Sequence, residues 1–352
     1  MHAAPIYLDN NAATPLDPEA AEAMRQCYFD GFANPSSQHS AGRRARRILE
    51  DAREGIANLL GAETTGRGAD RVVFTSGGTE ANNMAIFGLA SRDAADCSPS
   101  SLESQFSLVI SSAEHPSVSA AAAARATREG LRLRRLPLGP DGATSIASID
   151  DMLDERTRLA SVVLASGETG VLQPIAEIAD LCQDRGIAFH TDAAQAVGKI
   201  DVVFRRLSVD AMSVAAHKFH GPRGIGVLIA RHGVKVAPHL FGGFQQQGLR
   251  PGTESVALAV GMHKALEAWH RRRDKHESHL RELRNRLEQT ILADWPEAVV
   301  IGAMSERVPQ TSNIAFPGFD RQALAMALDL VGVACSTGSA FAIGSTEPSP
   351  TL

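Results

Sequence analysis

The chain of 352 residues is poor in cysteine, with only Cys27, Cys97, Cys182 and Cys335. None of the four has a second cysteine three positions away, so the spacing indicates neither a zinc site nor a disulfide framework. We therefore expect buried or idle thiols in a reducing cytoplasm, and no metal site.

Long apolar runs are also missing. No stretch approaches the roughly 20 apolar residues that span a bilayer, and residues 1–9 lack the charged and then apolar pattern of a signal peptide. The formal net charge is −5, which argues against a broad surface for nucleic acid or membrane. The one basic run, at 43–47, is followed by acidic residues and is interpreted as a solvated helix face. We expect neither nucleic acid nor membrane as a partner.

What the chain does have is a regular alternation of short apolar runs and helical patterns. The apolar runs predict strands at 71–74, 108–110, 159–165, 187–191, 210–214 and 226–230. Such strands, separated by helices, predict an α/β fold with a mostly parallel sheet covered on both faces. The polar stretches at 64–70 and 93–105 predict loops. Functional residues in such a sheet gather at the carboxyl ends of the strands.

A strongly helical pattern runs from 264 to 291. Its apolar residues recur at helical spacing and form one stripe, made of Leu280, Leu283, Leu287 and Ile291. We expect this helix to connect to a smaller α+β domain. The predicted division is a large cofactor-binding domain at 14–262 and a small domain at 1–13 and 263–352, the latter truncated in its C-terminal part.

Two predicted strands end at residues that suit pyridoxal phosphate. Lys218 precedes a tight turn at 219–224, and a lysine amine can bind the aldehyde of this cofactor as a Schiff base. Asp192 follows the strand at 187–191, and a carboxylate beside the pyridine nitrogen keeps that nitrogen protonated. Gln195 is placed to hydrogen-bond the ring oxygen. Taken alone, Asp192 is equally well explained as a helix N-cap.

Two more stretches complete the pattern. Gly78 and Thr79 lie in SGGTE, between a predicted strand and a helix, where free N–H groups bind phosphate. His115 follows the strand at 108–110, where an imidazole can stack on the cofactor ring. Either stretch alone is common, since glycine-rich turns and loop histidines abound. All four in this order predict a pyridoxal-phosphate site.

The motifs continue nearly from end to end, and the chain resembles the cysteine desulfurases of the NifS and IscS type. These are class V aminotransferase-like enzymes of fold type I. The stretches that carry the resemblance are YLDNNAATP at 7–15, NPSS at 34–37, FTSGGTEANN at 74–83, AEH at 113–115, HTDAAQ at 190–195, HK at 217–218, RPGTE at 250–254, STGSA at 336–340 and EPS at 347–349.

The resemblance implies a role for each matching residue near the cofactor ring. Lys218 is the Schiff-base lysine and, with His115, a catalytic residue. Asp192 faces the pyridine nitrogen and Gln195 the ring hydroxyl. His115 stacks on the ring and shuttles protons.

The resemblance also implies how the phosphate is held and which partners the chain has. Gly78, Thr79 and His217 bind the phosphate, and Thr253 reaches the phosphate in the other subunit of a homodimer. Such enzymes take sulfur from L-cysteine as a persulfide and leave L-alanine. The sulfur goes to an acceptor protein, in iron–sulfur cluster assembly or in thiolation pathways.

This sequence departs from the family pattern at the residue that accepts sulfur. The family has Gly-Ser-Ala-Cys, whereas this chain has Phe341 in place of the cysteine. A benzyl side chain cannot attack sulfur as a thiolate does. Cys335, six positions earlier, is either a displaced nucleophile or a buried cysteine at a strand end, and we favour the latter.

Other departures lie near the same site. Gly167 replaces an asparagine that helps hold cofactor and substrate, and Ala215 replaces a phosphate-binding serine. No residue can be assigned to the arginine that binds the substrate carboxylate, which the family carries beyond the Glu-Pro-Ser segment. We therefore expect a cysteine desulfurase-like enzyme with weakened or lost sulfur transfer. The alternatives are a cysteine or selenocysteine lyase that needs no acceptor thiol, and a catalytically degenerate dimer partner.

Overall fold

The computed structural model describes residues 5–89 and 106–338. Within these residues the dominant element is a seven-stranded sheet in the order β2-β8-β7-β6-β5-β3-β4. All neighbours are parallel except β8, which runs antiparallel to β2 and β7. The strands are β2 (Arg71–Thr75), β3 (Ser107–Ser111), β4 (Arg132–Leu136), β5 (Thr157–Ser161), β6 (Ala188–Asp192), β7 (Ala211–Ala215) and β8 (Gly226–Ala230). The predicted α/β fold with a mostly parallel sheet is confirmed.

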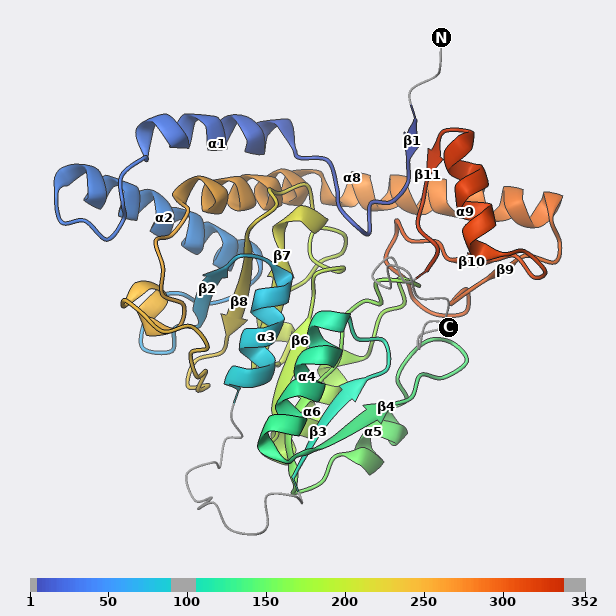
Figure 1. The fold of residues 1–352 in the computed structure, drawn as a ribbon, viewed down its shortest axis with the longest axis horizontal. Helices are drawn as coiled ribbons and strands as arrows, with labels where there is room; N and C mark the ends of the chain where they lie inside the picture. Colours follow the sequence, from blue (N-terminus) through green and yellow to red (C-terminus); the bar gives the residue numbers. More distant parts are fainter. Residues whose placement is uncertain (1–4, 90–105, 339–352) are drawn as a thin grey trace.

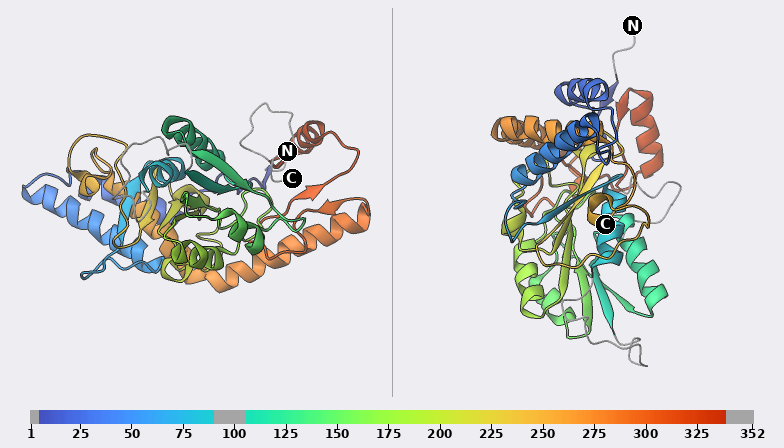
Figure 2. Two further views of the ribbon diagram at one scale, coloured as in Figure 1. Left: turned by 90° about the horizontal axis from the view of Figure 1, so that it is seen from below. Right: turned by 90° about the vertical axis from the view of Figure 1, so that its left-hand side faces the viewer.

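Helices cover both faces of this sheet (Figure 1, Figure 2). Residues of α3 and α4 pack on one face, and those of α2, α6 and the first part of α8 belong to the core on the other. Val72 and Val73 lie in different cores, because successive side chains of a strand point to opposite faces. The helices are α1 (Pro18–Asp30), α2 (Ser40–Leu59), α3 (Gly78–Gly88), α4 (Pro116–Glu129), α5 (Ile146–Met152), α6 (Ile175–Asp184), α7 (Phe204–Leu207), α8 (Val256–Asp294) and α9 (Arg321–Leu330), with short 3₁₀ helices η3 (Ala216–Lys218) and η4 (Gln245–Gly248).

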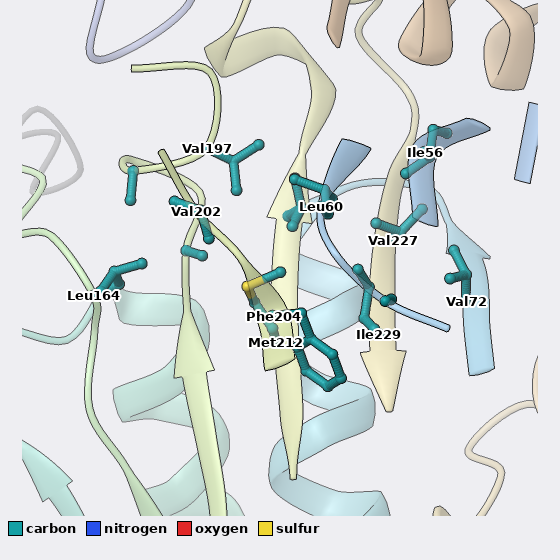
Figure 3. Packing of buried hydrophobic residues seen from close by; sticks show 14 of the residues in the cluster. Ile56, Leu60, Val72, Leu164, Val197, Val202, Phe204, Met212, Val227 and Ile229 are labelled. Atoms are coloured by element: carbon teal, nitrogen blue, oxygen red, sulfur yellow. The ribbon is translucent and has the colours of Figure 1, made fainter. Parts of the chain in front are cut away.

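The core on the α2 side is built from branched aliphatic side chains of the central strands. Figure 3 shows Ile56 of α2 close to Val227 of β8, with Met212 of β7 and Phe204 of α7 further along the sheet. All four are buried. This packing fixes β7 and β8 in place, and the residues after β7 carry the site described below.

Two of the strand predictions need correction. The first correction concerns β4, which was not predicted and whose sequence RLRRL is rich in arginine. It is an edge strand that pairs with β3, and an edge strand tolerates charge that a central strand does not. The strand predicted at 159–165 is shorter, since β5 ends at Ser161, although Leu164 N still donates to the carbonyl of Asp192. The predicted loop at 64–70 contains no helix or strand, and the one at 93–105 lies outside the described residues.

The helix predicted at 264–291 begins earlier and ends later, as the 39-residue α8. Its first half packs against α1 and α2 and carries buried residues such as Met262 and Leu266. The predicted apolar stripe lies in the second half, where Leu283 and Leu287 are largely exposed. The spacing of the stripe therefore predicted the helix correctly, and none of the buried residues of α8 belongs to the stripe.

A smaller assembly lies along the second half of α8 (Figure 1). It contains α9, the antiparallel pair of β9 (Val299–Val300) with β10 (Ile314–Ala315), and the parallel pair of β1 (Ile6–Tyr7) with β11 (Val333–Ala334). The beginning of the chain thus lies beside residues more than 300 positions later. The predicted division into 14–262 and 1–13 with 263–352 stays a prediction, because α8 runs through residue 262 without a break.

Two negative findings concern the described ranges 5–89 and 106–338 alone. No helix there combines the length and the apolar character needed to cross a bilayer. No three His, Cys, Asp or Glu side chains there are grouped so as to hold a metal ion.

Candidate active site

Lys218 and Asp192 lie at the same edge of the sheet. Asp192 is the last residue of β6, and Lys218 ends η3 directly after the neighbouring β7. Their side chains are 7% and 5% exposed, respectively. Because both strands are parallel, their carboxyl ends meet at one edge. The predicted pair is thus brought together in a buried place.

The Lys218 amine is held by the first loop of the chain. Its Nζ donates to the carbonyls of Asn11 at 2.5 Å and Ala12 at 3.0 Å. Burial lowers the pKa of Lys218, against the opposing effect of the carboxylates of Asp192 and Asp9. A lowered pKa increases the fraction of neutral amine, which is the form that reacts with an aldehyde.

Asp192 is a buried carboxylate whose hydrogen bonds come from neutral donors. Asn82 Nδ2 donates to Oδ2 at 2.7 Å, and the backbone N–H of Ala194 donates to Oδ1 at 2.9 Å. Residues 193–200 form turns and no helix, so the helix N-cap interpretation of Asp192 is wrong. A buried carboxylate favours positive charge on a group bound beside it. A protonated pyridine nitrogen is such a group.

His115 is the N-cap of α4, and its Nδ1 accepts from Ser117 N at 3.0 Å. Ser117 Oγ accepts a hydrogen bond from Asn82 Nδ2 at 2.8 Å. Asn82 therefore links the Asp192 carboxylate to the His115 cap. Burial and the charge of Lys218 lower the pKa of His115, whereas Asp192 opposes them. The predicted stacking of His115 on the cofactor ring stays a prediction.

Glu114, next to His115, joins two strand ends. Its Oε1 accepts from Ser111 Oγ at 2.7 Å and from Val163 N at 2.6 Å. Burial is the main cause that raises the pKa of Glu114 to about 8. The side chain is therefore protonated at neutral pH, and it fixes the backbone that carries His115.

The N-terminus of α3 provides the predicted phosphate cradle. Its N-cap, Gly77, has φ 156° and ψ −179° and no side-chain capping bond, a conformation open essentially to glycine alone. The first N–H groups of α3, including those of Gly78 and Thr79, are thus not capped by the side chain before them. A Cβ on Gly78 would lie 3.2 Å from the Cβ of Ala215, at the end of β7. The cradle therefore sits close to the strand that leads to Lys218.

An ion pair attaches the segment at 250–254 to this cradle. Arg250 Nε donates to Glu80 Oε1 at 2.8 Å, and Glu80 Oε2 accepts from Ser76 N at 2.6 Å. Thr253, two residues after Pro251, is exposed. The sequence analysis singled out the motif at 250–254 but not the pair that orients it.

The loop at 9–14 belongs to this site, although 1–13 was assigned to the small domain. Gln195 Nε2 donates to Asn11 O at 2.8 Å, and Thr14 Oγ1 donates to His217 O at 3.0 Å. Asn11 Nδ2 reaches Gly167 O at 3.2 Å. Gln195 and His217 therefore contact the same loop that holds Lys218. Burial and Lys218 lower the pKa of His217 to about 4.

Several residues that the sequence analysis did not select as site residues lie around Asp192. His190 is fully buried in β6, with Nδ1 2.9 Å from Ser161 Oγ and Nε2 2.9 Å from Ser213 Oγ. Burial lowers its pKa to about 4. These residues could have been found from the sequence as polar side chains inside predicted strands and helices, such as Asn82 in α3 and His190 in β6.

The departures noted in the sequence have different surroundings. A Cβ on Gly167 would lie 3.8 Å from the Gln195 side chain, so a larger residue has room beside Gln195. Cys335 follows β11, is partly buried, and has its thiol pKa raised by burial and by Asp9. A raised pKa reduces the thiolate fraction and so disfavours Cys335 as a nucleophile. Phe341 lies outside the described residues.

A cavity of about 1140 Å³ lies away from these residues. It is lined by α2, β2 and the loops at 232–236 and 244–247, together with Glu254. None of Lys218, Asp192 and His115 lines it. The chemistry at the sheet edge, and not this cavity, defines the active site.

The residues at the sheet edge fit pyridoxal phosphate. Lys218 would bind its aldehyde, Asp192 its ring nitrogen, and the start of α3 its phosphate, with His115, His217 and Gln195 close by. A mostly parallel sheet with helices on both faces and such a lysine at its carboxyl edge defines a pyridoxal-phosphate enzyme of fold type I.

The comparisons with known proteins give the family. The model of the aminotransferase class-V family matches residues 6–349. A cysteine desulfurase of Cereibacter sphaeroides is 42% identical over 98% of this chain and 85% of its own length. The NifS-like protein of Rickettsia africae has a solved structure with TM-score 0.84 and 28% identity, covering 95% of this chain and 88% of its own. The structure of SspA in complex with cysteine has TM-score 0.81 and 29% identity, covering 99% of this chain and 93% of its own. The chain belongs to the class-V aminotransferase family and is a pyridoxal-phosphate-dependent enzyme of the cysteine desulfurase kind.

Proposed function

We propose that the chain acts on L-cysteine, or a similar amino acid, and yields L-alanine and transferable sulfur. The observation that carries this proposal is the buried Lys218 beside Asp192, within a chain that is similar to cysteine desulfurases along its length. The bound cofactor supplies an electron sink for the substrate's electron pair. Asp192 maintains the positive charge that the sink needs, and Lys218 supplies the amine.

Two bases of the site are placed to carry protons. His115 has a pKa below its usual range, and so does Lys218, so both side chains hold an unprotonated nitrogen more readily than they would in water. A side chain that gives up and takes back a proton suits general acid–base work. We propose this role for Lys218 and His115.

The sulfur-transfer step is expected to be weak. Phe341 occupies the position of the family's acceptor cysteine, and the Cys335 thiol has a raised pKa. These two observations favour a second candidate, a cysteine or selenocysteine lyase that needs no acceptor thiol. For the desulfurase, a sulfur-acceptor protein, in iron–sulfur cluster assembly or thiolation, is the proposed partner.

We also propose a homodimer in the reducing cytoplasm. Thr253 is exposed, in the segment at 240–254, and this segment lines the same cavity as Pro35 and Ser36 of the α1–α2 connection. Phe241 and Phe244 of this loop are 88% and 84% exposed, and large exposed aromatic side chains are typical of protein interfaces. Cys27 is buried and forms no disulfide, as a reducing compartment favours.

The decisive experiment incubates the purified chain with pyridoxal phosphate, L-cysteine and a reductant, and measures alanine and sulfide. We expect a cofactor absorption band near the violet end of the visible spectrum, and alanine formation that is low or absent. A chain that stays colourless and shows no lysine adduct after borohydride reduction contradicts the cofactor assignment. Fast turnover that survives Cys335→Ser would replace the desulfurase proposal by the lyase. Light scattering at micromolar concentration tests the dimer, which a cofactor-loaded monomer would contradict.

A further inference from the structure

A second buried lysine lies beside the active site. Lys199 is 6% exposed, in the turns that follow β6, four residues after Gln195. Its Nζ donates to Gln195 Oε1. Within the part of the chain that the structure describes, Lys199 forms no ion pair with a carboxylate. A buried lysine without an acidic partner is costly, so its presence calls for an explanation.

Lys199 determines which way the Gln195 amide points. A lysine amine beside an amide attracts its oxygen, so the Gln195 NH₂ group must face the other way. That NH₂ group donates to Asn11 O at 2.8 Å, and Lys218 Nζ donates to the same carbonyl at 2.5 Å. The hydrogen bonds thus run from Lys199 through Gln195 to Asn11, where they meet the bond from Lys218.

The charged and titratable groups that act on Lys199, or on which it acts, are Lys218 and His217 of η3. Burial and the charge of Lys218 lower the pKa of Lys199 to about 7, and Lys199 in turn lowers the pKa of His217. The ammonium form of Lys199 has three donors and no acceptor, so it can pair only with the oxygen of the Gln195 amide.

We propose that Lys199 is a positioning residue, which locks the Gln195 amide with its NH₂ group toward Asn11 and the ring oxygen of the cofactor. The proposal rests on the proposed function, since it concerns the same cofactor. Without Lys199, the Gln195 amide is free to rotate by half a turn, and its oxygen would then face two acceptors, the Asn11 carbonyl and the ring oxygen.

The test measures cofactor binding and leaves turnover aside. The dissociation constant of pyridoxal phosphate is determined for the cofactor-free chain and for Lys199→Met, Lys199→Gln and the exposed control Lys275→Met. The midpoint of the pH titration of the visible band is recorded for each. We expect Lys199→Met to weaken binding at least about fivefold and to shift the midpoint, whereas Lys275→Met matches the unmodified chain. Lys199→Gln, which retains a donor, should recover part of the loss.

Two further measurements separate positioning from general support of the fold. Replacing a buried charge by an apolar side chain is often neutral or stabilising, so the cofactor-free Lys199→Met chain should unfold at an unchanged or higher temperature. In a Gln195→Ala background, Lys199→Met should raise the dissociation constant of pyridoxal phosphate by a factor of less than two. The proposal is overturned if Lys199→Met binds the cofactor with a dissociation constant within twofold of that of the unmodified chain. It is also overturned if Lys199→Met raises the dissociation constant as much in the Gln195→Ala background as in the unmodified chain, or if Lys199→Met lowers the unfolding temperature. If the unmodified chain binds no cofactor, the proposed function fails instead.

Discussion

The region around Lys218, which would hold the cofactor, and the region around Cys335, near the expected sulfur acceptor, are supported very differently by the fold. Lys218 lies at the edge of a seven-stranded sheet, buried and bonded to two carbonyls. Cys335 follows β11, a two-residue strand that pairs with the two-residue β1. It is partly buried beside Asp9, whose Oδ1 accepts from Ser336 Oγ at 2.6 Å.

This difference shows which changes the fold can tolerate. Asp192, Asn82 and Lys218 are held by core strands and helices, so a substitution there disturbs packing as well as chemistry. Cys335 lies outside these core elements, after a two-residue strand, so a substitution there disturbs less packing.

The largest effect is expected at the cofactor end. Lys218→Ala should abolish covalent attachment of pyridoxal phosphate, because it removes the amine that binds the aldehyde. Mass spectrometry after borohydride reduction measures this attachment. Lys275→Ala, an exposed lysine on α8, serves as the control and should retain the adduct. An adduct that persists in Lys218→Ala would place the cofactor on another lysine.

The two halves of α8 extend the comparison to stability. Leu266 is 1% exposed and Leu287 is 44% exposed. Leu266→Ala should lower the free energy of unfolding by about 2–5 kcal/mol, and Leu287→Ala by less than about 1 kcal/mol. Urea denaturation measures both, and equal losses would show that the second half of α8 is buried in solution.

Acid should remove the contribution of His190 to the stability of the sheet beneath the cofactor site, whereas the raised pKa of Glu114 acts in the opposite sense. The folded-state pKa of His190 is lowered to about 4 from an ordinary value of 6.5, so the stability it provides is present above pH 6.5 and lost as the pH falls toward 4. The loss should reach about 3 kcal/mol for this group, and His217 adds an effect of the same sign. His190→Gln should flatten the decline in urea midpoints between pH 7 and pH 4.5. An unchanged slope would show that His190 is not buried in its neutral form.

The smallest effect concerns the phosphate cradle. Gly78→Ala brings a Cβ to 3.2 Å from that of Ala215, a contact that a small shift relieves at a cost of about 1 kcal/mol. The cofactor dissociation constant should rise several-fold, and the added change Ala215→Gly should recover part of it. If the double variant binds no better than Gly78→Ala, the contact with Ala215 is not the cause.

The sequence predicted the parts of the molecule that leave a local pattern. Lys218, Asp192 and the glycine-rich turn before α3 each end an apolar strand, so their position at one sheet edge followed from the parallel order of the strands. The edge strand β4 was missed because its arginines hide the apolar alternation. The stripe at Leu283 and Leu287 predicted the helix but not its buried part, because periodicity alone does not tell which half of a helix is covered.

The contacts that organise the site leave no such pattern. Asn11 meets Gly167 and Gln195 across more than 150 residues of sequence, and Arg250 meets Glu80 across 170. A buried lysine such as Lys199 is indistinguishable in sequence from an exposed one. These contacts depend on tertiary packing, which brings loops of the chain together only in the folded protein.

The central claim is a complete cofactor site without its sulfur acceptor. Its most direct test compares persulfide and alanine formation from L-cysteine by the unmodified chain and by Phe341→Cys, both loaded with pyridoxal phosphate and assayed with a reductant. We expect the same cofactor spectrum in both proteins and at least about tenfold faster alanine formation in Phe341→Cys, since the variant gains a nucleophilic thiol. Equal rates in the two proteins, with both fully loaded, would contradict the claim.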